Sequence, residues 1–216
     1  MLFYLGVTMN RNIMLFALIA FGVIFFGKSE AIPIPVSDDH LPNYKISLNK
    51  TKTLIHIDGP IKSNLVSEVR IMLKKYPTIK TILLDSRGGN ARVGKQLSNL
   101  IFQFKLKTIS AKGCYSACTD AFIAGTKRYL VKGAKLGFHQ AGSMIPKFVS
   151  AKERKFIEKG RLGIEEHTKN LYRQQGVPES FVSQMHKAPY YDIWFPTTDE
   201  LIKSKVIHGL IDKKTM

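Results

Sequence analysis

Cysteine and acidic side chains are scarce in this sequence. Among its 216 residues there are two Cys and one Trp, and 16 Asp and Glu stand against 33 Lys and Arg. Two cysteines with no pair of histidines nearby do not make a zinc site, and the histidines show no metal-ligand spacing. We therefore expect neither a metal nor another cofactor.

The shortage of acidic residues leaves a formal net charge of +17 at pH 7. A charge of this size favours contact with anionic surfaces such as lipid headgroups or nucleic acid. The sequence has neither a zinc-ligand array nor an aromatic–basic stripe, so we expect no specific nucleic-acid binding. The basic side chains are predicted to form a solvated surface with, at most, weak attraction to an anionic membrane.

Repeats and low-complexity tracts are also absent. Hydrophobic residues make up 44% of the chain and charged residues 23%, which are globular values. Without an N-terminal targeting segment, about 185 residues are left, which suits one domain with a full-sized core.

The N-terminal segment has the pattern of an export signal. Residues 13–27 carry no charge, Arg11 precedes them, and a short segment ending in Ala31 follows. A positive flank, a short apolar run and a small residue at the end are typical of a secretory signal. We predict that residues 1–31 are a signal peptide cleaved after Ala31 or, alternatively, an uncleaved membrane anchor. Both place the protein outside the cytoplasm, either in the periplasm or on the outer side of the inner membrane.

The rest of the chain alternates between strand-like and helix-like segments. Residues 32–52 contain three prolines and are predicted to be a linker, and residues 53–216 to be one domain. Strands alternating with helices imply βαβ units and a largely parallel sheet. The strands are expected at 53–58, 81–84, 106–111, 128–131 and 136–139, and the helices at 63–75, 91–104, 116–124, 150–175 and after residue 197.

Three predicted strand ends carry residues suited to catalysis. The first leads into Gly88 and Gly89, the second into Ser116 at the start of a helix, and the third ends at His139. Strand ends of a parallel sheet gather at one edge. A serine hydroxyl becomes a nucleophile when a base takes its proton and a third group orients that base. A helix N-terminus and a glycine turn can offer free N–H groups to a developing oxyanion.

At this point the sequence resembles a known family, the proteolytic subunit of the Clp protease. In that family a Gly-Gly turn, a Gly-x-x-Ser segment and a segment ending in His-Gln follow one another. The matching segments here are residues 86–89, 113–117 and 137–140. The resemblance implies that Ser116 is the nucleophile, that His139 is its general base, and that the N–H groups of Gly89 and Ala117 form the oxyanion hole.

The resemblance extends over roughly residues 53–212. The long helix 150–175 resembles the family's projecting handle, and Asp192 falls at the position of the triad aspartate. Asp85 and Asp199 are the alternatives for that role. The resemblance implies an α/β, Clp protease/crotonase-like ββα spiral with a projecting helix, and a homo-oligomer that acts on peptide or protein substrates.

Two features depart from the cytosolic protease. The Cys-x-Ser-Ala-Cys spacing resembles an uncharacterised extracytoplasmic branch of the superfamily, and an export signal separates the chain from an ATP-driven unfoldase. Cys114 and Cys118 flank the predicted nucleophile, and an even count in an oxidising compartment suggests a possible disulfide. Two buried thiols are the slightly preferred interpretation, because helical geometry can point sulfurs at this spacing apart.

The leading hypothesis is an exported or membrane-tethered, ATP-independent serine peptidase that uses Ser116, His139 and Asp192. A serine–lysine dyad, as in related signal peptide peptidases, is disfavoured by His139. The acyl-CoA chemistry of the crotonase branch does not fit an extracytoplasmic location. From a different class, the chain could be a catalytically silent scaffold that binds peptides or assembles at the membrane.

Overall fold

A computed structural model of the chain describes residue 38, residues 40–142 and residues 148–215. The predicted signal or anchor segment, residues 1–31, lies outside these ranges, as does the first part of the predicted linker. Within the described residues, no helix combines the length and the apolar character needed to cross a membrane.

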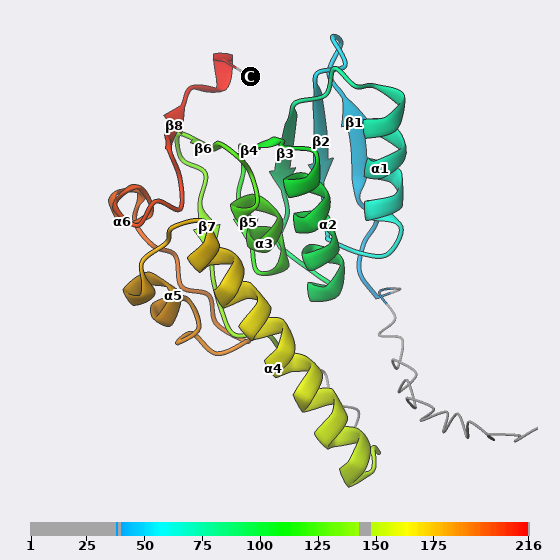
Figure 1. The fold of residues 1–216 in the computed structure, drawn as a ribbon, viewed down its shortest axis with the longest axis vertical. Helices are drawn as coiled ribbons and strands as arrows, with labels where there is room; N and C mark the ends of the chain where they lie inside the picture. Colours follow the sequence, from blue (N-terminus) through cyan, green and yellow to red (C-terminus); the bar gives the residue numbers. More distant parts are fainter. Residues whose placement is uncertain (1–37, 39, 143–147, 216) are drawn as a thin grey trace, which may run out of the picture. The chain divides into compact units, whose positions relative to one another are not determined.

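A six-stranded sheet forms the centre of the domain (Figure 1). In spatial order the strands are β1 (Lys45–Leu48), β2 (Leu54–Asp58), β3 (Thr81–Asp85), β4 (Lys107–Ser110), β6 (Arg128–Val131) and β8 (Gly209–Ile211). The pair β1–β2 is antiparallel, and every other neighbouring pair is parallel. The predicted α/β fold with a largely parallel sheet is therefore confirmed.

Strand β1 differs from the sequence prediction, because it lies inside the stretch interpreted as a linker. Its polar and apolar residues alternate, and Ile46 and Leu48 pack against the main core. One apolar face is enough for an edge strand that pairs with β2. The prolines of residues 32–52 all precede β1, so they do not interrupt it.

The helices begin and end close to the predicted positions. They are α1 (Leu65–Lys75), α2 (Ala91–Gln103), α3 (Ala117–Ile123), α4 (Ala151–Gln174), α5 (Glu179–Met185) and α6 (Thr198–Lys203), and a short 3₁₀ turn covers Lys213–Thr215. Helix α2 packs against both α1 and α3 (Figure 1). Reciprocal capping boxes start α4, through Ser150 and Glu153, and α6, through Thr197 and Glu200.

Helix α4 is attached to the domain by its second half. Its first turns are exposed, and its buried residues are Glu165, Thr168 and Tyr172. Figure 1 shows the N-terminal half of α4 extending beyond the sheet. The buried part brings polar side chains of α4 against α3, where the predicted nucleophile lies.

An aromatic cluster holds the chain at the end of the predicted strand 136–139. The ring of Phe138 packs edge-on against Tyr172 and Phe181 and at a tilt against Trp194. The backbones of Phe138 and Trp194 exchange two hydrogen bonds, of 2.9 and 2.8 Å. Because His139 directly follows Phe138, these contacts set the position of the predicted base.

Candidate active site

A second, two-stranded sheet joins the two predicted catalytic segments. Strand β5 (Cys114–Tyr115) pairs in parallel with β7 (Leu136–Gly137). The N–H of Ser116 then donates to the carbonyl of Gly137 at 2.9 Å. Ser116 and His139 therefore leave the ends of two paired strands, and both line one small pocket.

The backbone of Ser116 has an unusual conformation. Its φ is 53° and its ψ is −130°, at the turn from β5 into α3. A residue with a Cβ pays on the order of 1–3 kcal/mol to occupy such a region, and strain of this kind clusters at functional sites. The side chain makes no capping hydrogen bond to α3, so the hydroxyl is not used to stabilise the helix.

Gly88 allows the preceding turn to approach this serine closely. Its φ is +98°, and a Cβ added to it would lie 2.7 Å from both the Cβ of Ser116 and the carbonyl oxygen of Tyr115. The next residue, Gly89, has a φ of +142°, and a Cβ there would lie 2.3 Å from the carbonyl oxygen of Ile61. Both positions therefore need glycine, which explains the Gly-Gly turn in physical terms.

The two predicted oxyanion donors are free of protein acceptors. Within the described residues, neither the N–H of Gly89 nor that of Ala117 makes a hydrogen bond. Ala117 is the first residue of α3, where N–H groups have no partner inside the helix. Ala117 lines the pocket of Ser116 and His139, whereas Gly89 lines a second pocket, so that the joint oxyanion hole stays a prediction.

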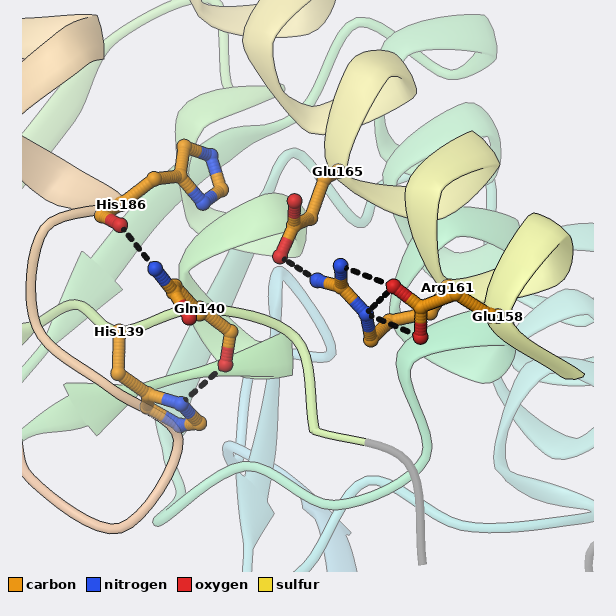
Figure 2. A network of polar contacts seen from close by, with 6 residues as sticks. All are labelled: His139, Gln140, Glu158, Arg161, Glu165 and His186. Atoms are coloured by element: carbon orange, nitrogen blue, oxygen red, sulfur yellow. Dashed lines mark hydrogen bonds and ion pairs between the residues drawn. The ribbon is translucent and has the colours of Figure 1, made fainter. Parts of the chain in front are cut away.

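The imidazole of His139 is turned toward the backbone of the next residue. Its Nδ1 lies 2.6 Å from the carbonyl oxygen of Gln140 (Figure 2). Gln140 is itself held by two bonds of 2.9 Å, from its N–H to the carbonyl of Ala188 and from its Nε2 to the carbonyl of His186. A carbonyl that accepts a proton from Nδ1 leaves Nε2 as the basic nitrogen.

Among the described residues, none of the three candidate aspartates is a hydrogen-bond partner of His139. Asp192 is exposed, and its Oδ1 accepts the N–H of Ile193 at 2.8 Å. Asp199 is exposed on α6. In the described part of the chain, no hydrogen bond joins His139 to Asp192, Asp199 or Asp85. The third triad member thus stays a prediction.

Asp85 has a structural role, because it joins the end of β3 to the loop that leads to Ser116. At the end of β3 its buried carboxylate accepts bonds from the Nε2 of His56 at 3.0 Å and from the N–H groups of Ala111 and Lys112 at 2.8 and 2.7 Å. Burial alone would raise the pKa of Asp85, but these hydrogen bonds hold it below its ordinary value. The loop that leads to Ser116 is thereby fixed against the end of β3.

Cys114 and Cys118 form a disulfide around Ser116, the predicted nucleophile. Their Cα atoms are 5.3 Å apart, and both residues are fully buried. The bond links β5 to the first turn of α3, so it closes the chain segment that carries Ser116. Within the described residues, no group of three or more His, Cys, Asp or Glu could hold a metal ion.

Three polar residues that the sequence reasoning missed line the pocket with Ser116 and His139: Asp120, Glu165 and His186. Asp120 is 5% exposed, and Thr168 donates to its Oδ2 at 3.1 Å. Burial raises the pKa of Asp120 to about 7. Asp120 lies one helical turn after Ser116, and that spacing was the available signal.

His186 and Glu165 complete the polar lining. The two ring nitrogens of His186 are buried and have no hydrogen-bond partner within the described residues. Burial, with smaller contributions from Lys169, His139 and Arg161, lowers the pKa of His186 to about 4. Glu165 pairs with Arg161, which also binds Glu158 (Figure 2).

Comparisons with known proteins support the fold. No protein-family model matches the chain, and no curated protein matches it. Among solved structures, ClpP1 from Listeria monocytogenes matches with a TM-score of 0.60 and 20% identity over 76% of this chain and 93% of that one. A mutant form of ClpP1 from the same organism matches with a TM-score of 0.62 and 18% identity over 76% and 94%. At this identity the likeness shows a Clp protease fold and nothing finer.

Proposed function

We propose that this chain with a Clp protease fold is a serine hydrolase, specifically a peptidase, with Ser116 as nucleophile and His139 as general base. The observation that carries the proposal is the backbone of Ser116. A strained, non-capping serine at the start of α3 faces the same pocket as a histidine. A serine that only capped the helix would need neither the strain nor the histidine.

The proposed reaction follows from these positions. The Oγ of Ser116 attacks the substrate carbonyl while the Nε2 of His139 takes its proton, and the N–H groups of Gly89 and Ala117 stabilise the oxyanion. His139 then gives the proton to the leaving amine, and an acyl-enzyme remains. Water, deprotonated by His139, releases the acid and restores Ser116.

Asp192 is proposed as the residue that stabilises the imidazolium. It directly precedes Ile193 and Trp194, and Trp194 pairs with Phe138 beside the base. Because the carbonyl of Gln140 already holds Nδ1 in this structure, Asp192→Asn should slow the reaction less than His139→Ala does. Equal losses in the two variants would show that Asp192 is indispensable.

We also propose that the protein works outside the cytoplasm, exported by residues 1–31 or anchored by them, without an ATP-driven partner. The Cys114–Cys118 disulfide supports this location, because such bonds persist in oxidising compartments. An alkaline phosphatase fused to the C-terminus should be active, whereas an active cytoplasmic reporter would contradict export. The membership of an extracytoplasmic branch of the superfamily is part of the same proposal.

A homo-oligomer is proposed from the exposed half of α4. Phe156 and Leu162 there are 42% and 50% exposed, and unpartnered apolar side chains on a projecting helix suit a contact between copies. Light scattering in about 0.15 M salt, where long-range repulsion is screened, should give a mass above the monomer's. A monomer at micromolar concentration would contradict association.

Contact with an anionic membrane surface is tested by sedimentation with phosphatidylglycerol vesicles.

A fluorophosphonate probe tests the catalytic proposal directly. It should label the wild type, and Ser116→Ala and His139→Ala should lose labelling. Ser150→Ala is the matched control, because Ser150 caps α4 through a hydrogen bond to Glu153 and lies outside the pocket. If the wild type is not labelled but still binds peptides, the protein is the catalytically silent scaffold instead.

A further inference from the structure

We propose that the pocket beside Ser116 binds the side chain of a lysine at the acyl side of the scissile bond. The inference rests on the proposed hydrolase function. Ala117, whose N–H is one of the two proposed oxyanion donors, lines the same pocket as Ser116. A side chain attached next to the attacked carbonyl would therefore point into this pocket.

The size of the pocket selects a slender side chain. Its volume is about 40 Å³, which is room for roughly three water molecules, whereas a cavity that binds benzene measures about 150 Å³. An aromatic ring is therefore too large, whereas the ammonium group of a lysine and the one or two methylene groups next to it fit, with the rest of the stem outside the pocket. The walls include Phe138, Ile164 and Met185, which offer apolar contact to a chain of methylene groups.

A buried carboxyl gives the pocket its preference for a cation. Among the described residues, Asp120 has one hydrogen-bond partner, the hydroxyl of Thr168, and no lysine or arginine pairs with it. An ionised carboxylate without a cation is costly in a buried position. A ligand ammonium would compensate that charge and favour the ionised form, whereas a neutral side chain would leave the carboxyl without compensation.

A second acceptor faces the same space. His186 is neutral near pH 7 because its pKa is lowered to about 4, and neither ring nitrogen has a partner among the described residues. A neutral imidazole keeps one nitrogen as an acceptor, and an ammonium brings three donors. Glu165 adds a further carboxylate, whose charge is offset by Arg161 (Figure 2). Among the described residues, the pocket therefore presents acceptors and no lysine or arginine.

The charges outside the pocket do not reverse this preference. Lys169 and Arg161 influence His186 electrostatically, but Arg161 is bound to Glu158 and Glu165 and neither cation lines the pocket. Among the described residues, Asp120 and Glu165 are the acidic groups that line it, and the imidazoles of His139 and His186 line it as well. A cationic head group thus meets the carboxyl group of Asp120, while the charge of Glu165 is already offset by Arg161.

The test compares two phosphonate inhibitors on the full chain. Peptidyl diphenyl phosphonates ending in lysine or in norleucine have the same backbone and nearly the same side-chain length, and only the first carries an ammonium. The lysine compound should label wild type roughly tenfold faster or more, the gain expected for one charge-assisted hydrogen bond. Equal rates, or a faster norleucine compound, would overturn the inference.

Variants then test whether Asp120 is the source of the preference for lysine. Asp120→Asn should bring the ratio of the two labelling rates close to one, and Asp199→Asn, which changes an exposed aspartate outside the pocket, should leave it unchanged. If Asp120→Asn does not fold, the ratio of the two labelling rates measured on the wild type still tests the inference. A wild type labelled by a simple fluorophosphonate but without lysine preference refutes only this inference, whereas no labelling by any probe refutes the proposed function.

Discussion

Asp120 follows Ser116 by one turn of α3, and the two side chains line the same small pocket. The proposed nucleophile and the proposed binding group therefore belong to one short segment. This segment is closed at its start by the Cys114–Cys118 disulfide and is contacted by Thr168 of α4. A change at either contact should reach both groups, which makes the segment the best place to test the site.

Asp120 should make the stability of the protein depend on pH. Its folded-state pKa of about 7 lies above the ordinary value of 3.8, so its contribution is complete below about pH 4 and is lost as the pH rises through about 7. The side chain in Asp120→Asn cannot ionise. The free energy of unfolding of this variant, relative to that of the wild type, should therefore rise by roughly 4 kcal/mol as the pH goes from about 4 to about 7. Urea unfolding at pH 4, 5.5 and 7.5, with Asp199→Asn as control, measures the difference. A difference independent of pH would contradict this prediction.

His186 should act in the opposite direction. Its folded-state pKa, about 4, lies below the ordinary 6.5, so its contribution is present above about pH 6.5 and is lost as the pH falls through about 4. His186→Gln should therefore flatten the acid limb of the stability profile between those values. Thermal melts at intervals of half a pH unit provide the measurement. His40→Gln, at an exposed position, serves as the control, and an unchanged acid limb in His186→Gln would refute the assignment.

The strain at Ser116 predicts that function and stability can be separated. Ser116→Gly should abolish fluorophosphonate labelling and raise the free energy of unfolding by about 1 kcal/mol, because glycine occupies a positive φ without steric cost. Ser116→Ala should also lose labelling but keep the strained backbone, so it should not be stabilised. Calorimetry on both variants makes the comparison. Equal melting temperatures for the two would argue against strain at this residue.

The disulfide predicts redox-dependent labelling. Reduction should release the segment that holds Ser116 at its unusual φ and ψ and should slow phosphonate labelling several-fold. The double variant Cys114→Ser, Cys118→Ser should label slowly with or without dithiothreitol, which controls for effects of the reagent itself. A reduced wild type that labels at the full rate would show that the bond is dispensable for the site.

The sequence was most informative where local chemistry sets the structure. Capping residues fixed the starts of α4 and α6, and the Gly-Gly turn and Ser116 fell at strand ends as expected. The polar lining of the pocket was not predicted, because it depends on α4 packing against both α3 and α5. Asp120 and Glu165 look like ordinary helical surface residues until that packing buries them. Strand β1 was missed for a similar reason, since only its pairing with β2 distinguishes it from a linker.

The disulfide also has a consequence for the unfolded chain. It joins residues only four positions apart, and closing so short a loop removes little conformational entropy from the unfolded state, about 2 kcal/mol compared with about 4.7 for a loop of 100 residues. Both cysteines lie in the main core, but most of that core is formed by apolar side chains of the sheet and helices. Oxidation thus constrains a single turn, and a reduced molecule should differ from the oxidised one mainly at the segment that carries Ser116.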